Sequence, residues 1–167
     1  MTDGEQVSPH LARDTVALLT PVLDGEALAA ICALSKCPCD VIAFKQGSLA
    51  VMADDREGLA DDAAARVGRI LGDVVVLAME RRDGQLSVVA WKGGVRGEEL
   101  PPGLALDRAP EYIVALMTGT MTIEQLIEHV PDCVYSGRMG RWQASRILRR
   151  ALRDARRQRS EGQAHPE

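Results

Sequence analysis

Arginine side chains gather near the C-terminus of the chain. Residues 138–159 hold nine arginines and one aspartate, whereas residues 1–137 hold 11 basic and 21 acidic side chains. Arginine donates hydrogen bonds in a planar fork that fits phosphate and carboxylate oxygens, so a helix with one arginine face can bind nucleic acid or an acidic protein. The same helix could also be solvated, or dock on the acidic body of its own chain or of a second copy. We predict a binding surface made of Arg141, Arg146, Arg149, Arg150, Arg153 and Arg157.

The four cysteines form a second set of candidate residues. Cys32, Cys37 and Cys39 fall within eight residues, and Cys133 is distant in the sequence. Four converging thiolates would hold zinc or an iron–sulfur cluster, and a Cys37–Cys39 pair could be redox-active. Cys32, however, falls on the apolar stripe of a predicted helix, where a free thiol behaves as a small hydrophobic side chain. We therefore predict ordinary thiols and no metal or other cofactor, with these four cysteines as the alternative ligand set.

Signatures of catalysis are absent from the sequence. It contains no GxSxG, HExxH, P-loop or dinucleotide-binding motif. Its three histidines are separated, with His10 and His165 near the ends and His129 late in a predicted helix. The acidic pairs Asp54-Asp55 and Asp61-Asp62 flank the start of another predicted helix, where they favour the positive end of its dipole. The sequence therefore predicts a protein that is not an enzyme.

Composition narrows the class of protein. The chain has 167 residues, of which 46% are apolar, 26% charged and 3% aromatic. This length and apolar content are sufficient for a buried core and exclude a disordered chain. No apolar run reaches the roughly 18 residues that a membrane span requires, and the polar, acidic N-terminus does not resemble a targeting segment. We expect a cytoplasmic protein without membrane insertion.

The elements that would position these residues follow an α-α-β-β-α-β-β order. This order predicts an α+β fold, with a small antiparallel sheet of two hairpins around a central helix, followed by a mainly helical C-terminal module. Asp24 is the expected N-cap of the second helix, Gly72 the C-cap of the third, and Asp83-Gly84 the turn of the second hairpin. The expected elements are helices over 8–20, 25–35 and 59–71 and hairpins over 41–53 and 74–91.

Glycine and proline in the stretch 92–103 predict a linker or large loop, and helices follow it. Thr122 and Gln125 form a capping box, and the last helix is expected to begin near Arg141, with Leu148 and Leu152 holding it to its neighbour. The predicted organisation is a disordered tail over 1–7, an α+β module over 8–97, a linker over 98–103, a helical, helix-turn-helix-like module over 104–158, and a disordered tail over 159–167.

Residues 25–92 resemble the roadblock/dynein-light-chain family in their order of elements. Gly47 stands at the position of the family's turn glycine, and residues 59–71 at that of its central helix. The resemblance implies a profilin-like α+β module that dimerises and serves as a platform for Ras-like GTPases. The family has a further strand where this sequence has the glycine-rich stretch 92–103, so the expected sheet departs from the family pattern there.

The segments MTGTMTIEQLIEHV and RWQASRILRRAL resemble the helical segments that follow bacterial PATAN-type regulatory domains. The resemblance rests on Thr122, Leu126, Ile127 and Leu148. It implies a role in regulation and does not require DNA binding.

Together these features predict a non-enzymatic cytoplasmic regulatory or scaffolding protein. It would form a homodimer and bind a protein partner through the α+β platform and the basic helix, and the roadblock resemblance suggests a small Ras-like GTPase as that partner. The first alternative is a nucleic-acid-binding regulator that uses the arginine-rich helix. The second alternative is a cysteine-ligated metal or iron–sulfur protein.

Overall fold

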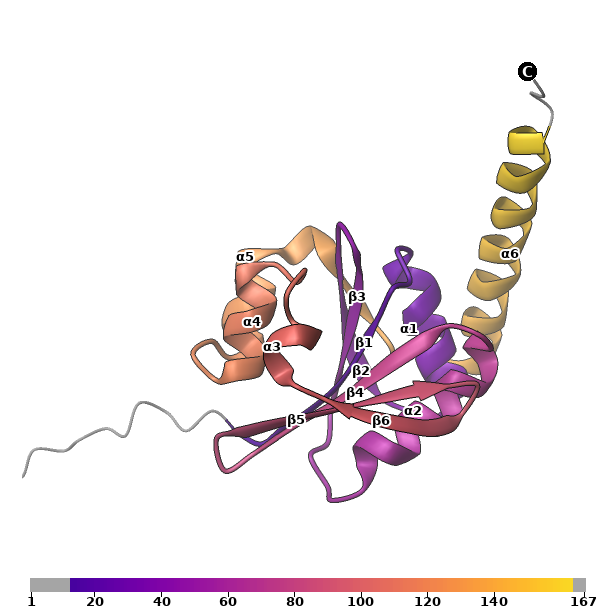
Figure 1. The fold of residues 1–167 in the computed structure, drawn as a ribbon. Coiled ribbons are helices and arrows are strands. Elements are labelled where there is room, and N and C mark those ends of the chain that lie inside the picture. The colour runs from indigo at the N-terminus through magenta and orange to yellow at the C-terminus, as the bar shows by residue number, and fades with distance from the viewer. Residues whose placement is uncertain (1–12, 164–167) are drawn as a thin grey trace, which may run out of the picture.

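The computed structural model describes residues 13–163, which form one antiparallel sheet with helices on both faces (Figure 1). The strands are β1 (Thr15–Thr20), β2 (Cys39–Phe44), β3 (Gly47–Met52), β4 (Val75–Arg82), β5 (Gln85–Lys92), β6 (Val95–Leu100) and β7 (Val134–Ser136). The helices are α1 (Gly25–Leu34), α2 (Leu59–Leu71), α3 (Pro102–Ala105), α4 (Glu111–Thr118), α5 (Ile123–His129), the 3-10 helix η1 (Pro131–Cys133) and α6 (Arg141–Gln163). The seven strands lie in the order β6-β5-β4-β1-β3-β2-β7, which confirms the predicted α+β class.

The sheet separates two hydrophobic cores. On one face α1 and α2 bury side chains such as Leu28 and Val67 against the strands. On the opposite face α4 and α5 contribute Ile113, Met117 and Leu126. Figure 1 shows this division, with α3, α4 and α5 on one side of the sheet and α1, α2 and α6 on the other. Both sheet faces are therefore covered, and the central strands are buried on both sides.

The predicted first helix, over residues 8–20, is wrong in its described part. Thr15–Thr20 form β1, which pairs with β3 on one side and β4 on the other. Val16, Ala17, Leu18 and Leu19 are all buried, because alternate residues enter the two different cores. Such an unbroken apolar run does not distinguish a doubly covered strand from a helix. Residues 8–12, and the predicted tail over 1–7, lie outside the described residues.

The predicted linker over 98–103 is also wrong. Val95–Leu100 form β6, which pairs with β5 at the edge of the sheet, and α3 begins at Pro102. Gly93 and Gly94 have positive φ angles of 60° and 80°, so the glycines make the turn of a hairpin. The glycine-rich stretch 92–103 therefore contains the strand β6 and no linker.

The other predicted local signals are confirmed. Asp83 and Gly84 both have positive φ angles, as the turn between β4 and β5 requires. The Asp24 carboxylate accepts a hydrogen bond from the Ala27 amide at 3.0 Å and so caps α1. Gly72 ends α2 at the predicted place.

The C-terminal segment does not form a helix-turn-helix. Between α5 and α6 the chain makes η1 and β7, and β7 pairs with β2. The buried residue of α5, Leu126, lies in the core on one face of the sheet, whereas α6 packs against α1 on the other face. The predicted tail over 159–167 is wrong up to Gln163, because α6 continues to that residue. Residues 164–167 lie outside the described part.

The capping box of α5 provides a test of this local structure. The Thr122 hydroxyl accepts from the Gln125 amide at 3.2 Å, and the Gln125 side chain accepts from the Thr122 amide at 2.9 Å. We expect Thr122→Ala to lower the free energy of unfolding by about 1 kcal/mol, measured by urea denaturation, because the Gln125 amide loses the hydroxyl that accepts its hydrogen bond. Thr118→Ala, at an exposed position near the end of α4, is the control and should change it by less than about 0.5 kcal/mol. Equal effects of the two substitutions would contradict the role of the capping box.

Candidate partner-binding helix

The first half of α6 is held against α1. Ala144 and Ile147 are buried and pack with Ala30 of α1. Arg150 Nη2 donates to Glu26 Oε1 at 3.0 Å, which adds an exposed ion pair near the N-terminus of α1. These contacts fix the direction of α6 relative to the sheet.

The second half of α6 extends past α1 into solvent (Figure 1). Every residue from Leu152 to Gln163 is exposed, and the side chain of Leu152 is 54% exposed. Leu148 does pack against the core, as predicted, but the prediction that Leu152 holds α6 to its neighbour is wrong. The apolar stripe of α6 is longer than the ten residues of α1, so its last positions have no helix to cover them.

Six of the eight arginines of α6 lie on one side of the helix. Successive residues of an α-helix are rotated by about 100° around its axis. By this rotation, five of the six arginines predicted to bind a partner lie on a common side of α6. The sixth, Arg141, lies about 80° around the helix from the nearest of them. Arg156, which the sequence analysis did not select, belongs with the five, because it follows Arg149 and Arg153 at helical spacing. We call these six residues the arginine face; together they span an arc of about 120°. They are Arg146, Arg149, Arg150, Arg153, Arg156 and Arg157.

The arginine face is almost uncompensated. Within the described residues, Arg150 is its one member with a carboxylate oxygen within 4 Å. Arg149, Arg153 and Arg156 line a shallow surface depression together with Leu152. Asp154, the nearest acidic residue in the sequence, lies outside the arc. This surface therefore presents a continuous positive charge to solvent.

The cysteines do not assemble into one ligand set. Cys32, Cys37 and Cys39 are buried in the core between the sheet and α1 and α2. Cys133 is partly exposed in η1, and its neighbours Val130 and Val134 pack against the core on the opposite face. Between residues 13 and 163, no group of three or more histidine, cysteine or acidic side chains is arranged to hold a metal ion.

Thiol reactivity should differ between these cysteines. A hydrogen bond with Cys39 and burial raise the pKa of Cys32, and burial raises the pKa of Cys37. Because the thiolate is the reactive form, we expect Ellman's reagent to titrate one thiol per chain promptly at pH 8 and all four after denaturation. Cys133→Ser should remove the prompt reaction. A prompt reaction of two or more thiols would show that the cysteine core opens readily.

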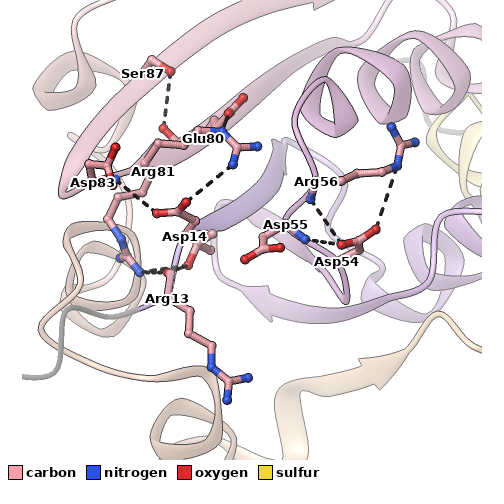
Figure 2. Close-up of polar contacts among 11 residues, drawn as sticks. Arg13, Asp14, Asp54, Asp55, Arg56, Glu80, Arg81, Asp83 and Ser87 are labelled. Carbon is pink, nitrogen blue, oxygen red and sulfur yellow. Dashed lines mark hydrogen bonds and ion pairs between the residues drawn. The ribbon is translucent and has the colours of Figure 1, made fainter.

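A partly buried polar cluster joins β4 to the segment before β1. Figure 2 shows the Arg81 guanidinium beside the backbone of Arg13, and Asp14 beside Asp83. Asp14 accepts from the Asp83 amide at 3.1 Å and forms an ion pair with Arg82 at 3.6 Å. Arg82 Nη2 is buried and has no hydrogen-bond partner among residues 13–163. The hydrogen bonds and the ion pair of the cluster join β4 to the start of β1 and so support the fold.

His129 is the one histidine among residues 13–163. His129 packs on Tyr112 with ring centroids 5.9 Å apart, and His10 and His165 lie outside the described part.

No family model, no curated protein and no solved structure matches the chain. No helix between residues 13 and 163 is long and apolar enough to cross a membrane. The function is therefore inferred from α6 and its surroundings.

Proposed function

We propose that this chain is a non-enzymatic regulatory or scaffolding protein that binds a negatively charged partner through the arginine face of α6. The observation that carries the proposal is an arginine face on a helix whose second half extends beyond the body of the protein. The first candidate partner is a protein. The roadblock resemblance makes a small Ras-like GTPase one such candidate, with the sheet as a platform in a cytoplasmic homodimer.

The energetics of α6 support a binding role over a structural one. Like charges at i,i+4 destabilise a helix by about 0.2–0.5 kcal/mol per pair. The arginine face contains three such pairs, and its outer half gains no packing against the body in return. A partner's negative charges would offset this repulsion. The pairs are Arg146–Arg150, Arg149–Arg153 and Arg153–Arg157.

The second candidate partner is nucleic acid. The observation that favours it is the absence of any acidic side chain within the arc of the arginine face. A phosphate backbone presents a regular row of negative charges, and arginine binds phosphate oxygens in a bidentate manner. Such a uniform positive surface is suited to that target.

Charge reversal tests whether the arginine face binds a partner. We expect Arg149→Glu with Arg153→Glu to weaken partner binding at least tenfold, because two attractive charges become repulsive. The melting temperature should change by only a few degrees, since both side chains are exposed. Binding is measured by quantitative affinity enrichment from cells with the intact chain as bait, followed by titration of the purified partner.

The matched control is Arg66→Glu with Arg108→Glu, which makes the same change in net charge at exposed positions outside α6. This control should leave binding unchanged. If the α6 variant retains its partners, the arginine face is not the binding surface. If the α6 variant unfolds instead, the arginine face is structural and the proposal is wrong.

A further inference from the structure

Trp142, in the first turn of α6, is exposed without a structural reason. Its side chain is 84% exposed, the largest exposed fraction among the large hydrophobic residues of the described chain. The other tryptophan, Trp91, is 8% exposed and belongs to the core against α1 and α2. Tryptophan contributes to stability mainly through the area it buries, so the fold gains little from Trp142. An indole left in water on a charged helix indicates an interaction surface.

Trp142 lies in line with four members of the arginine face. They follow it at intervals of four, three, four and three residues, which places all five side chains within about 80° around the helix. The last residue of this line lies 14 positions after Trp142, or about 21 Å along the axis at the rise of an α-helix. No acidic residue lies on it. We call this line the Trp–Arg row; it consists of Trp142, Arg146, Arg149, Arg153 and Arg156.

We propose that the Trp–Arg row binds single-stranded nucleic acid, with one base stacked on the Trp142 indole and the following phosphates bound by the four arginines. This inference rests on the proposed function of α6 and names the chemistry of its partner. Proteins that bind single strands combine a positive track for the backbone with exposed aromatic rings for the bases. The Trp–Arg row provides one ring and four cations in that arrangement.

The surroundings of Trp142 favour this partner over an acidic protein. The centre of a protein interface requires a desolvated cluster of apolar side chains around its aromatic anchor. Around Trp142 the sequence neighbours are Arg141 and Gln143, and the next helical turn supplies Ser145 and Arg146. A stacked base needs only the face of one ring, so the polar neighbours do not oppose it.

The position of Trp142 on the helix also argues against a membrane surface and a duplex. A helix that lies on a membrane carries tryptophan on its apolar side, whereas Trp142 lies nearly opposite Ala144 and Ile147, the residues packed on α1. In a duplex the bases are already stacked on one another, so an indole gains a base partner only from an unpaired strand.

The test is a titration of the intact chain with a fluorescein-labelled oligodeoxythymidylate, followed by anisotropy and by tryptophan emission. We expect tryptophan quenching on binding and a slope of log K against log salt of about −3, because each of four phosphate contacts contributes about 0.7. Trp142→Ala should weaken binding about tenfold or more, and Trp142→Phe should retain most of the affinity but lose the quenching. Arg149→Gln with Arg153→Gln should reduce the slope to about −1.5.

The control for charge is Arg66→Gln with Arg108→Gln, which should leave both affinity and slope unchanged. Equal binding by the intact chain and Trp142→Ala would overturn the stacking proposal, as would tighter binding of a duplex of equal length. Absence of oligonucleotide binding at low salt would also overturn it. In that case the affinity enrichment from cells tests the proposed function separately. A protein partner that is lost on charge reversal of α6 would leave the proposed function intact. No partner of any kind would reject both the stacking proposal and the proposed function.

Discussion

Replacing Arg81 by methionine should lower the free energy of unfolding by about 3 kcal/mol or more, because the change removes three hydrogen bonds that a buried charged group donates. Arg81 is 3% exposed, although it is a charged residue. Its Nη1 donates to the Leu116 carbonyl at 2.6 Å, and its Nη2 donates to the Arg13 carbonyl at 2.7 Å and to Thr15 Oγ1 at 2.9 Å. One side chain thus joins β4, the start of β1 and the end of α4.

The electrostatic role of Arg81 follows from where α4 ends. Leu116 lies in the last turn of α4, where the helix dipole presents partial negative charge that a cation stabilises. Burial lowers the pKa of the Arg81 guanidinium, and the carboxylate of Asp14 opposes that shift. Methionine would fill a similar length of space without supplying any of the donors. The Leu116 carbonyl would keep a bond from the Gly119 amide, and the Arg13 carbonyl one from the Thr15 hydroxyl. The expected loss therefore comes from the three charge-assisted hydrogen bonds themselves rather than from a cavity.

The measurement is chemical denaturation of the intact chain, with Arg82→Gln as the matched control. Arg82 is the next residue of β4, but its ion pairs with Asp14 and Glu80 involve partly exposed side chains. Exposed or half-exposed ion pairs contribute about 0–1 kcal/mol, so the control should lose little stability. If the two variants lose the same free energy, Arg81 is not the buried junction that its hydrogen bonds indicate.

The role of Arg81 shows where sequence reasoning ends for this chain. In the sequence it stands beside Arg82 before the Asp83-Gly84 turn, and nothing local distinguishes the two arginines. The difference arises because strand alternation turns Arg81 towards α4, which is added to the sheet much later in the chain. Long-range packing of this kind leaves no periodic signal.

Local signals were predicted well because their causes are local. The turn at Asp83-Gly84, the Asp24 cap and the Thr122–Gln125 capping box depend on a few neighbouring residues, and each is present as expected. β1 was mistaken for a helix because burial on both faces removes the alternation of a strand. The sequence predicts a linker in place of β6 because glycines are common both in flexible linkers and in the tight turn of a hairpin.

Part of the candidate site could be predicted from the sequence, because helical spacing is also a local signal. Helical spacing was sufficient to group the arginines of α6, and it contained the signal for Arg156 as well. The exposure of Leu152 could not be predicted, because it depends on α1 ending before α6 does. The exposure of Trp142 has another cause, because Trp142 lies nearly opposite the residues of α6 that pack on α1.

Gly47 carries the second large effect, and its cause is close approach rather than an unusual backbone angle. Gly47 opens β3, and its φ angle is not in the left-handed region. The end of β1 and the loop after it cross directly over its Cα, held by the bond from Ser48 Oγ to the Val22 carbonyl at 2.7 Å. A methyl group at position 47 would overlap the carbonyl oxygen of Thr20 and reach within 3.2 Å of Pro21 Cα.

We therefore expect Gly47→Ala to cost about 3 kcal/mol of unfolding free energy, at the upper end of the range for overpacked sites. The oxygen that the methyl group meets belongs to the backbone of a central strand, so it cannot rotate away, and relief requires β1 and β3 to separate. Gly103→Ala is the matched control, because Gly103 lies in α3 with open space around its Cα. Alanine favours the helix there and should be neutral or stabilising by a few tenths of a kcal/mol. Thermal and urea denaturation of both variants measure the difference in their free energies of unfolding. A small loss of stability in Gly47→Ala would mean that the loop after β1 crosses β3 less tightly than its hydrogen bond indicates.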